Sequence, residues 1–517
     1  MRCRAQIRSA FYCAVVALFF VASAACAERP QYGGVLRVEL RASSITLNPR
    51  RWKPGSQEFA TNERLAELIF DRLVRLDNYG RFQPQLATEW SHDSSAKRWQ
   101  FALRQGVKFS DGTLLAPSDV VAALQPLLAT GMQISATPTG VTIQSANPAS
   151  DLLEQLASGS HFVYRSDAQG NLLGTGPFVL ENATLNSTFS RAEKSAADGA
   201  APQTQHLRFR FNELCWSGRP FVDAIDVTLG VPPLRALLDS QLGKADFAEL
   251  SEDTARRAQQ SNVKVWTSSP LTLYAVKFPA PPKSANERKL REALSLSLDR
   301  NAMARVLLQK QAEAASSFLP QWLSGYAFLF DMESNLERAK ELRASLTASS
   351  VGAAQPLRLQ LDGNNDSSRL IGERVVVNAR AAGLALQIVS RTTAHTPSDG
   401  TVAKAESEAQ LVSWRYTSLS PREALDGFAL SSRWEIPPGG VPADADARYA
   451  WEKHMMEEKN LLPLVSVPDF VALDSRVRNW SPSAWGDWHL ADVWLDQGDP
   501  ATNLRDAGAK TPAGTKP

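Results

Sequence analysis

The chain has 517 residues, a formal net charge of +2 and a charged fraction of 21%. This length exceeds what one hydrophobic core holds, so we expect two or three domains. The near-neutral charge excludes the strongly basic surface that a nucleic-acid partner requires. Of four cysteines, two lie within the first 13 residues. The remaining Cys26 and Cys215 are too few for a disulfide framework.

The N-terminus has the order of a secretory signal peptide. Three arginines within the first eight residues precede an apolar run over residues 10–22, and small residues follow up to Ala27. Thirteen apolar residues are too few for a permanent membrane-spanning helix. We predict a signal peptide over 1–27, whose removal lowers the formal net charge from +2 to −1. Cleavage after Ala27 releases a soluble protein, whereas cleavage before Cys26 leaves a cysteine for lipid attachment; both readings stay open.

A strand, turn and helix follow one another in the first quarter of the chain. Trp99, Phe101 and Leu103 alternate with Gln, Ala and Arg, which is the period of a half-buried strand. Pro117 suits the first turn of a helix, and Asp119 places a negative charge near the helix N-terminus.

The second half of the chain contains helical and strand patterns. Leu290, Ala293 and Leu294 recur at helical spacing, and Asp299 is placed to cap a further helix. Residues 356–361 read as a strand. From residue 507 onward the composition predicts a disordered tail over 507–517.

Thirteen short sequence blocks, each occurring once, follow one another along the chain at residues 33–40, 65–77, 86–90, 99–112, 118–121, 174–178, 215–225, 241–247, 291–303, 318–320, 339–342, 461–464 and 492–495. In residue types, order and spacing, these blocks closely resemble the sequence motifs of the extracellular solute-binding proteins of family 5, the dipeptide- and oligopeptide-binding receptors of bacterial ABC importers. The resemblance covers essentially the whole mature chain.

The resemblance implies an α/β, two-lobed periplasmic-binding-protein-like (type II) fold with an additional small domain on the first lobe. When the domain order of the family is transferred to this chain, lobe I is expected to hold residues 28–64, 172–268 and 468–506. The extra domain II is expected to hold 65–171, and lobe III 269–467.

It also implies a function. The protein is expected to be a monomeric periplasmic binding component of an ABC importer, which closes about a hinge on a peptide-like solute and delivers it to the membrane permease. No catalytic residue and no cofactor is implied. The alternatives are a binder of another solute, such as an oligosaccharide or metal chelate, and a sensor or scaffold without cargo. An exported protein could also stay membrane-anchored through Cys26.

Peptide receptors of the family carry acidic residues in lobe III, the first of which pairs with the peptide's α-amine. In the matching stretch, residues 413–421, the acid positions hold Thr417 and Ser420. A buried ammonium without a carboxylate costs several kcal/mol, so capture through that contact is in doubt. The resemblance indicates Trp414, Tyr416, Thr417 and Ser420 as ligand-binding candidates. Arg415 is expected to be a solvated charge.

Other motifs carry less weight. Ser94 and Lys97 fit a Ser-x-x-Lys pattern, but they lie in a polar hairpin turn without the partner motifs of acyl enzymes. Asp362, Asn364 and Glu373 fit part of a calcium loop that lacks its glycine. The six histidines show no ligand spacing, so no metal site is predicted.

Overall fold

The computed structural model describes residues 29–497 except for positions 57, 182–203, 328–329, 331, 347–351, 353–354, 362–365, 391–408, 433, 435 and 437–439. The predicted signal peptide with Cys26, the predicted tail over 507–517, and Asp362 and Asn364 lie outside the described residues.

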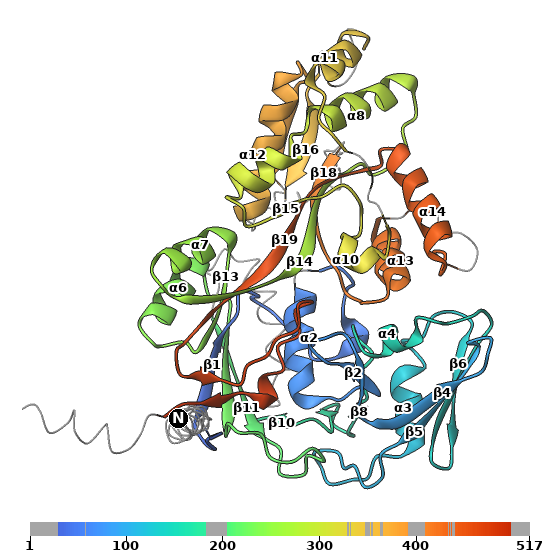
Figure 1. The fold of residues 1–517 in the computed structure, drawn as a ribbon, viewed down its shortest axis with the longest axis vertical. Helices are drawn as coiled ribbons and strands as arrows, with labels where there is room; N and C mark the ends of the chain where they lie inside the picture. Colours follow the sequence, from blue (N-terminus) through green and yellow to red (C-terminus); the bar gives the residue numbers. More distant parts are fainter. Residues whose placement is uncertain are drawn as a thin grey trace, which may run out of the picture.

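An 11-stranded mixed sheet runs through both lobes (Figure 1). Its strands, in spatial order, are β10 (Phe178–Leu180), β11 (Gln205–Phe211), β12 (Ala224–Leu229), β1 (Val35–Glu39), β13 (Phe247–Leu250), β19 (Leu461–Leu473), β14 (Lys264–Lys277), β18 (Ala409–Arg415), β16 (Leu357–Leu361) and β17 (Leu386–Ser390), with β15 (Glu313–Ala314) paired to β19. The first five strands belong to lobe I, and β18, β16 and β17 belong to lobe III.

The two long strands β14 and β19 connect the lobes. They pair antiparallel with register shifts between Thr267 and Thr272, where Pro270 lies opposite Pro468. Proline cannot donate a hydrogen bond to a sheet, so paired prolines weaken the ladder at this point. The weak point lies near the middle of β14, and Figure 1 shows both strands running from one lobe to the other, so it is the natural place for a hinge.

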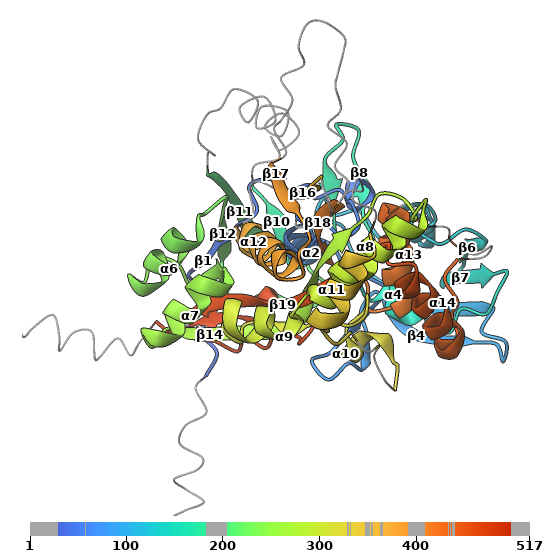
Figure 2. The same cartoon turned by 90° about the horizontal axis from the view of Figure 1, so that it is seen from above.

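Helices cover the lobes on either side of these strands (Figure 2). Lobe I carries α2 (Glu58–Ile69), α6 (Pro233–Gln241) and α7 (Glu252–Gln260). Lobe III carries α8 (Ala285–Ser297), α9 (Arg300–Ala302), a π-turn (Met303–Leu307), α10 (Gln321–Ser324), α11 (Leu336–Ala344), α12 (Asp366–Ala381), α13 (Pro421–Ser432) and α14 (Ala445–Glu457). Leu290 and Leu294 are buried, and the carboxylate of Asp299 accepts a hydrogen bond from the Ala302 amide at 2.8 Å. The predicted helix and the predicted cap are confirmed.

Domain II has a sheet of its own, in the order β4 (Ala87–His92), β5 (Arg98–Leu103), β7 (Gly140–Ser145) and β6 (Met132–Thr137). Trp99, Phe101 and Leu103 are buried on one face, as their alternation predicts. Helix α3 (Pro117–Leu124) begins at the predicted proline, and Asp119 accepts a hydrogen bond from the Ala116 amide at 2.8 Å. Helix α4 (Leu152–Leu156) follows β7 and turns toward lobe III.

Short elements complete the described chain: η1 (Pro49–Arg51), β2 (Val74–Leu76), β3 (Phe82–Pro84), β8 (Arg165–Ser166), β9 (Leu172–Leu173), β20 (Val477–Arg478), η3 (Leu490–Asp492) and β21 (Trp494–Leu495). Leu65 and Phe70, which the sequence assigned to domain II, pack with Leu36 and Val38 of β1 in the lobe I core. The domain boundaries stay a prediction. None of the described helices combines the length and apolarity needed to cross a membrane.

Candidate functional site

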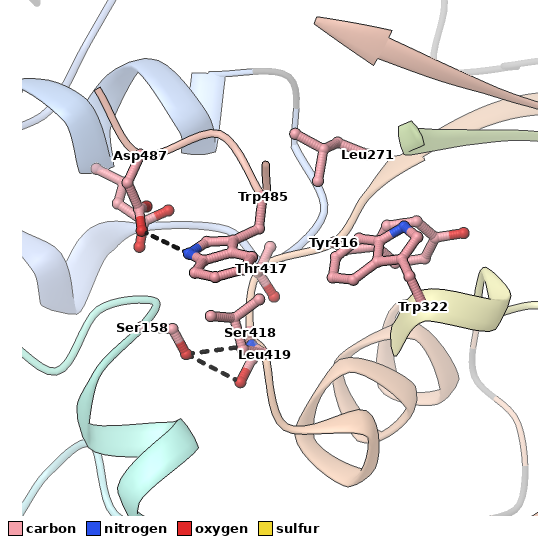
Figure 3. Close-up of a pocket in the computed structure, with 10 residues that line it drawn as sticks. Ser158, Leu271, Trp322, Tyr416, Thr417, Ser418, Leu419, Trp485 and Asp487 are labelled. Atoms are coloured by element: carbon pink, nitrogen blue, oxygen red, sulfur yellow. Dashed lines mark hydrogen bonds between the residues drawn. The ribbon is translucent and has the colours of Figure 1, made fainter. Parts of the chain in front are cut away.

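A small cavity lies where lobe I, domain II and lobe III meet; we call it the interlobe cavity. Its lining residues are Glu63, Ser158, Leu271, Trp322, Tyr416, Thr417, Ser418, Leu419, Trp485 and Asp487. Figure 3 shows most of these side chains converging from separate segments of the chain. The volume of about 20 Å³ has room for one water molecule. The lobes are therefore closed on each other at this point.

A larger cavity of about 390 Å³ lies beside the crossing strands; we call it the hinge cavity. Its walls are Ser269, Pro270, Glu313, Ala314, Ala315, Ser316, Ser317, Leu319, Pro320, Gln321, Trp322 and Ser466. Trp322 lines both cavities, and its indole N–H donates to the Pro270 carbonyl at 3.2 Å. The volume falls within the range of pockets that hold small molecules.

Two of the four residues predicted to bind ligand line the interlobe cavity. The Tyr416 hydroxyl donates to the Phe318 carbonyl at 2.9 Å, and burial raises the pKa of this phenol. Thr417 follows it in the wall. A Cβ placed on Gly159 would come within 2.9 Å of the Thr417 carbonyl oxygen, so only glycine lets domain II approach the lobe III backbone this closely.

Trp414 lines neither cavity. Its ring lies against Gly55, where a Cβ would come within 2.1 Å of the indole, and it meets Phe428 edge-on with 5.1 Å between ring centroids. The Gly55 carbonyl accepts a hydrogen bond from the Arg415 amide at 3.3 Å. Trp414 thus packs between a loop of lobe I and helix α13 of lobe III.

Ser420 is fully buried and does not reach either cavity. Its hydroxyl donates to Asp151 of domain II and accepts from the Glu423 amide at 3.2 Å, which caps helix α13. Nearby, the Leu419 amide donates to the Ser158 hydroxyl at 3.2 Å. Hydroxyl groups at and next to the positions where peptide receptors of the family carry acids therefore form hydrogen bonds between lobe III and domain II.

Arg415 is buried, so the expectation of a solvated charge is wrong. Its guanidinium pairs with Asp469 at 2.6 Å, and Arg64 of α2 pairs with the same carboxylate. Burial alone would raise the pKa of Asp469, but the two arginines hold it at about 2. Asp469 lies on β19, 54 residues after Arg415, and the sequence offers no sign of this pair.

Sequence reasoning also missed the acidic wall of the interlobe cavity. Glu63 on α2 accepts a hydrogen bond from Arg72 at 2.6 Å, and Asp487 accepts one from the Trp485 indole at 3.0 Å. Burial, aided by Asp487 and Glu67, raises the pKa of Glu63 to about 8 against the opposing effect of Arg72. No pattern in the sequence links these positions, because they come together only in the fold.

The chemistry that these side chains offer is noncovalent. Trp322, Tyr416 and Trp485 supply aromatic faces, and Glu63 and Asp487 supply carboxylates. In the described ranges, no three His, Cys, Asp or Glu side chains are grouped as a metal site. Such a lining suits recognition of a small solute by hydrogen bonds, stacking and charge.

The sequence is similar to a family of known proteins. The family model of bacterial extracellular solute-binding proteins, family 5 Middle, matches residues 81–435. The nickel-binding periplasmic protein of Escherichia coli (strain K12) is 24% identical over 387 residues, which are 66% of this chain and 68% of that protein. A probable di/tripeptide-binding protein 5 of Pseudomonas aeruginosa (strain UCBPP-PA14) is 24% identical over 306 residues, 52% of this chain and 56% of that protein.

Solved structures show the same fold. The oligopeptide-binding protein AppA from Bacillus subtilis, in complex with a nonapeptide, superposes with a TM-score of 0.72 at 16% identity, covering 90% of this chain and 100% of that one. NikA from Brucella suis, in complex with Fe(III)-EDTA, superposes with a TM-score of 0.69 at 18% identity, covering 89% and 100%. The predicted two-lobed fold is confirmed.

Proposed function

Because this chain belongs to the bacterial extracellular solute-binding proteins of family 5, we propose that it captures a small peptide-like solute between its lobes and delivers it to an ABC permease. The observation that carries the proposal is the interlobe cavity. Its walls come from lobe I, domain II and lobe III, so one group of the guest held there contacts all three domains at once. A guest of this kind favours the closed form over the open one.

The hinge makes such closure physically reasonable. Among the strands of the described residues, only β14 and β19 run between the lobes, and their ladder is interrupted where Pro270 faces Pro468. Rotation about this crossing would separate the cavity walls, and it would have to accommodate a buried core that continues from α6 and α7 of lobe I to α8 and α12 of lobe III. The permease would then distinguish the closed, loaded form from the open form.

The predicted ligand residues take two roles in this proposal. Tyr416 and Thr417 form the lobe III wall against the guest. Trp414 and Ser420 stabilise that wall and the closed arrangement, through Gly55 of lobe I and Asp151 of domain II. We infer that the rest of the solute lies in the hinge cavity, because Trp322 lines both cavities.

A metal chelate is the second candidate for the cargo. One relative is named as a nickel-binding protein, and one neighbour of the same fold holds Fe(III)-EDTA. The acid positions of peptide receptors are Thr417 and Ser420 here. We place the mature protein in the periplasm as a monomer, and mass spectrometry of its N-terminus distinguishes cleavage after Ala27 from lipid attachment at Cys26.

Native mass spectrometry of gently purified protein tests the function directly, because a co-purified guest reveals its class by its mass. A thermal-shift screen should follow with mixed dipeptides, malto-oligosaccharides and a nickel–histidine chelate, since a ligand that binds the folded state raises its melting temperature. A shift with peptides alone supports the peptide-like cargo. A shift with sugars or the chelate alone identifies another solute, and the absence of any guest or shift would favour a scaffold without cargo.

A further inference from the structure

Carboxylates outnumber cations around the interlobe cavity. Arg72 pairs with both Glu63 and Glu67 on consecutive turns of α2, at 2.6 and 3.0 Å. Asp487, which acts electrostatically on both glutamates, accepts its hydrogen bond from the neutral Trp485 indole. Glu63 and Glu67 therefore share the Arg72 guanidinium, and Arg415 also acts on Glu63, whereas the donor to Asp487 is neutral.

The neighbouring arginines do not correct this imbalance. Arg64 pairs with Glu249 and Asp469, and Arg415 also pairs with Asp469. Together with the first group, five carboxylates face three guanidinium groups, an excess of two negative charges when all are ionised. His489 also acts on Glu67 and opposes the rise in the pKa of that carboxyl.

Two of these carboxyl groups, Glu63 and Glu67, have a raised pKa. Burial raises the pKa of Glu63 to about 8, and Asp487 and Glu67 add to the effect. Burial also raises the pKa of Glu67, with Asp487 as the next cause. A positive charge placed beside Glu63 would lower the pKa of that carboxyl and favour release of its proton.

The size and the other walls of the cavity fit a cationic group. A volume of about 20 Å³ holds one water molecule, and an ammonium group is of similar size. Trp322, Tyr416 and Trp485 surround it with aromatic rings. Such rings attract ammonium and guanidinium groups through their negative faces.

We propose that the interlobe cavity takes the positively charged group of the guest, a primary ammonium, and that Glu63 and Asp487 are its counter-ions. The inference rests on the proposed function and specifies its guest further. It also accounts for Thr417 and Ser420 at the acid positions. The negative charge that peptide receptors carry in lobe III is supplied here from the lobe I side of the cleft.

Isothermal titration of the mature protein tests this assignment with three probes: L-alanyl-L-alanine, its N-acetyl derivative and agmatine. The wild-type protein should bind a free-amine probe at least about tenfold more tightly than the acetylated dipeptide, because the acetyl group removes the charge. Glu63→Gln and Asp487→Asn should each weaken that binding by about tenfold. Asp253→Asn is the control, since it also removes one carboxylate but lies at an exposed ion pair and does not line the cavity.

Proton release gives a second readout that a purely structural role would not change. Titrations at pH 7 in buffers of different ionisation enthalpy should show a proton released when the amine binds wild-type protein, and none in Glu63→Gln. Equal binding of free and acetylated dipeptide, or unchanged binding by both variants with normal circular dichroism, would overturn the inference. A co-purified guest without a cationic group would overturn it while leaving the proposed function intact. No guest of any kind would remove both.

Discussion

Replacing Gly55 by alanine perturbs the contact between lobe I and lobe III at one atom. Gly55 lies just before α2 with φ +74°, and a Cβ there would come within 2.1 Å of the Trp414 ring on β18. Real Cβ atoms do not approach a ring this closely. The overlap must be relieved either by movement of Trp414 or by separation of the lobes.

The free-energy cost of Gly55→Ala has two contributions. Alanine at a left-handed backbone position costs about 1–2 kcal/mol, whatever surrounds it. Overpacking against the indole adds about 1–3 kcal/mol, and this second part applies only while the lobes are closed. The closed form, and with it the affinity for a guest that requires closure, should therefore fall by about five- to 150-fold.

Gly106→Ala is the matched control. Gly106 has φ +77°, and nothing lies within 4 Å of its Cβ position. Small-angle scattering should show a larger radius of gyration for Gly55→Ala than for wild type or the control, and tryptophan emission should shift as Trp414 becomes exposed. Both variants should melt within a few degrees of each other. Identical scattering for the two variants, or a much lower melting temperature for Gly55→Ala alone, would refute a closure-dependent contact.

Two further predictions concern buried charge. Asp469→Asn leaves the buried Arg64 and Arg415 without their shared counter-ion, so chemical denaturation should show a loss of about 3–5 kcal/mol. Asp253→Asn, at an exposed pair, should cost less than about 1 kcal/mol, and equal losses would contradict the reasoning. Burial raises the pKa of Glu452 from 4.5 to about 7. The folded state then keeps a proton that the unfolded state releases, so stability should fall by up to about 3 kcal/mol between pH 4.5 and 7. Glu63, whose pKa is also raised, adds to the same pH dependence, so Glu452→Gln should reduce the stability difference between pH 5 and 8 by about 3 kcal/mol without abolishing it. An unchanged difference would exclude Glu452 as a source.

Several local features could be predicted because neighbours in the chain determine them. The alternation of Trp99, Phe101 and Leu103 predicts a strand with one buried face, and the structure has it. Asp299 caps its helix through an amide three residues away. The ordered blocks led to the family and thereby to the two-lobed fold, which no single pattern would have predicted.

Only half of the predicted ligand-binding residues line the cavity. Tyr416 and Thr417 line the cavity, whereas Trp414 and Ser420 lie in contacts between lobes, and the burial of Arg415 was missed. A helix or strand forms from interactions a few residues apart, and these leave a period that can be read in the chain. The cavity instead depends on α2, α4, the end of β18 and the loop at 485–487 meeting across a sheet that links distant segments. Side chains that meet only through such long-range pairing leave no local pattern, so the charge of the cleft and the partners of its arginines were decided by the tertiary structure.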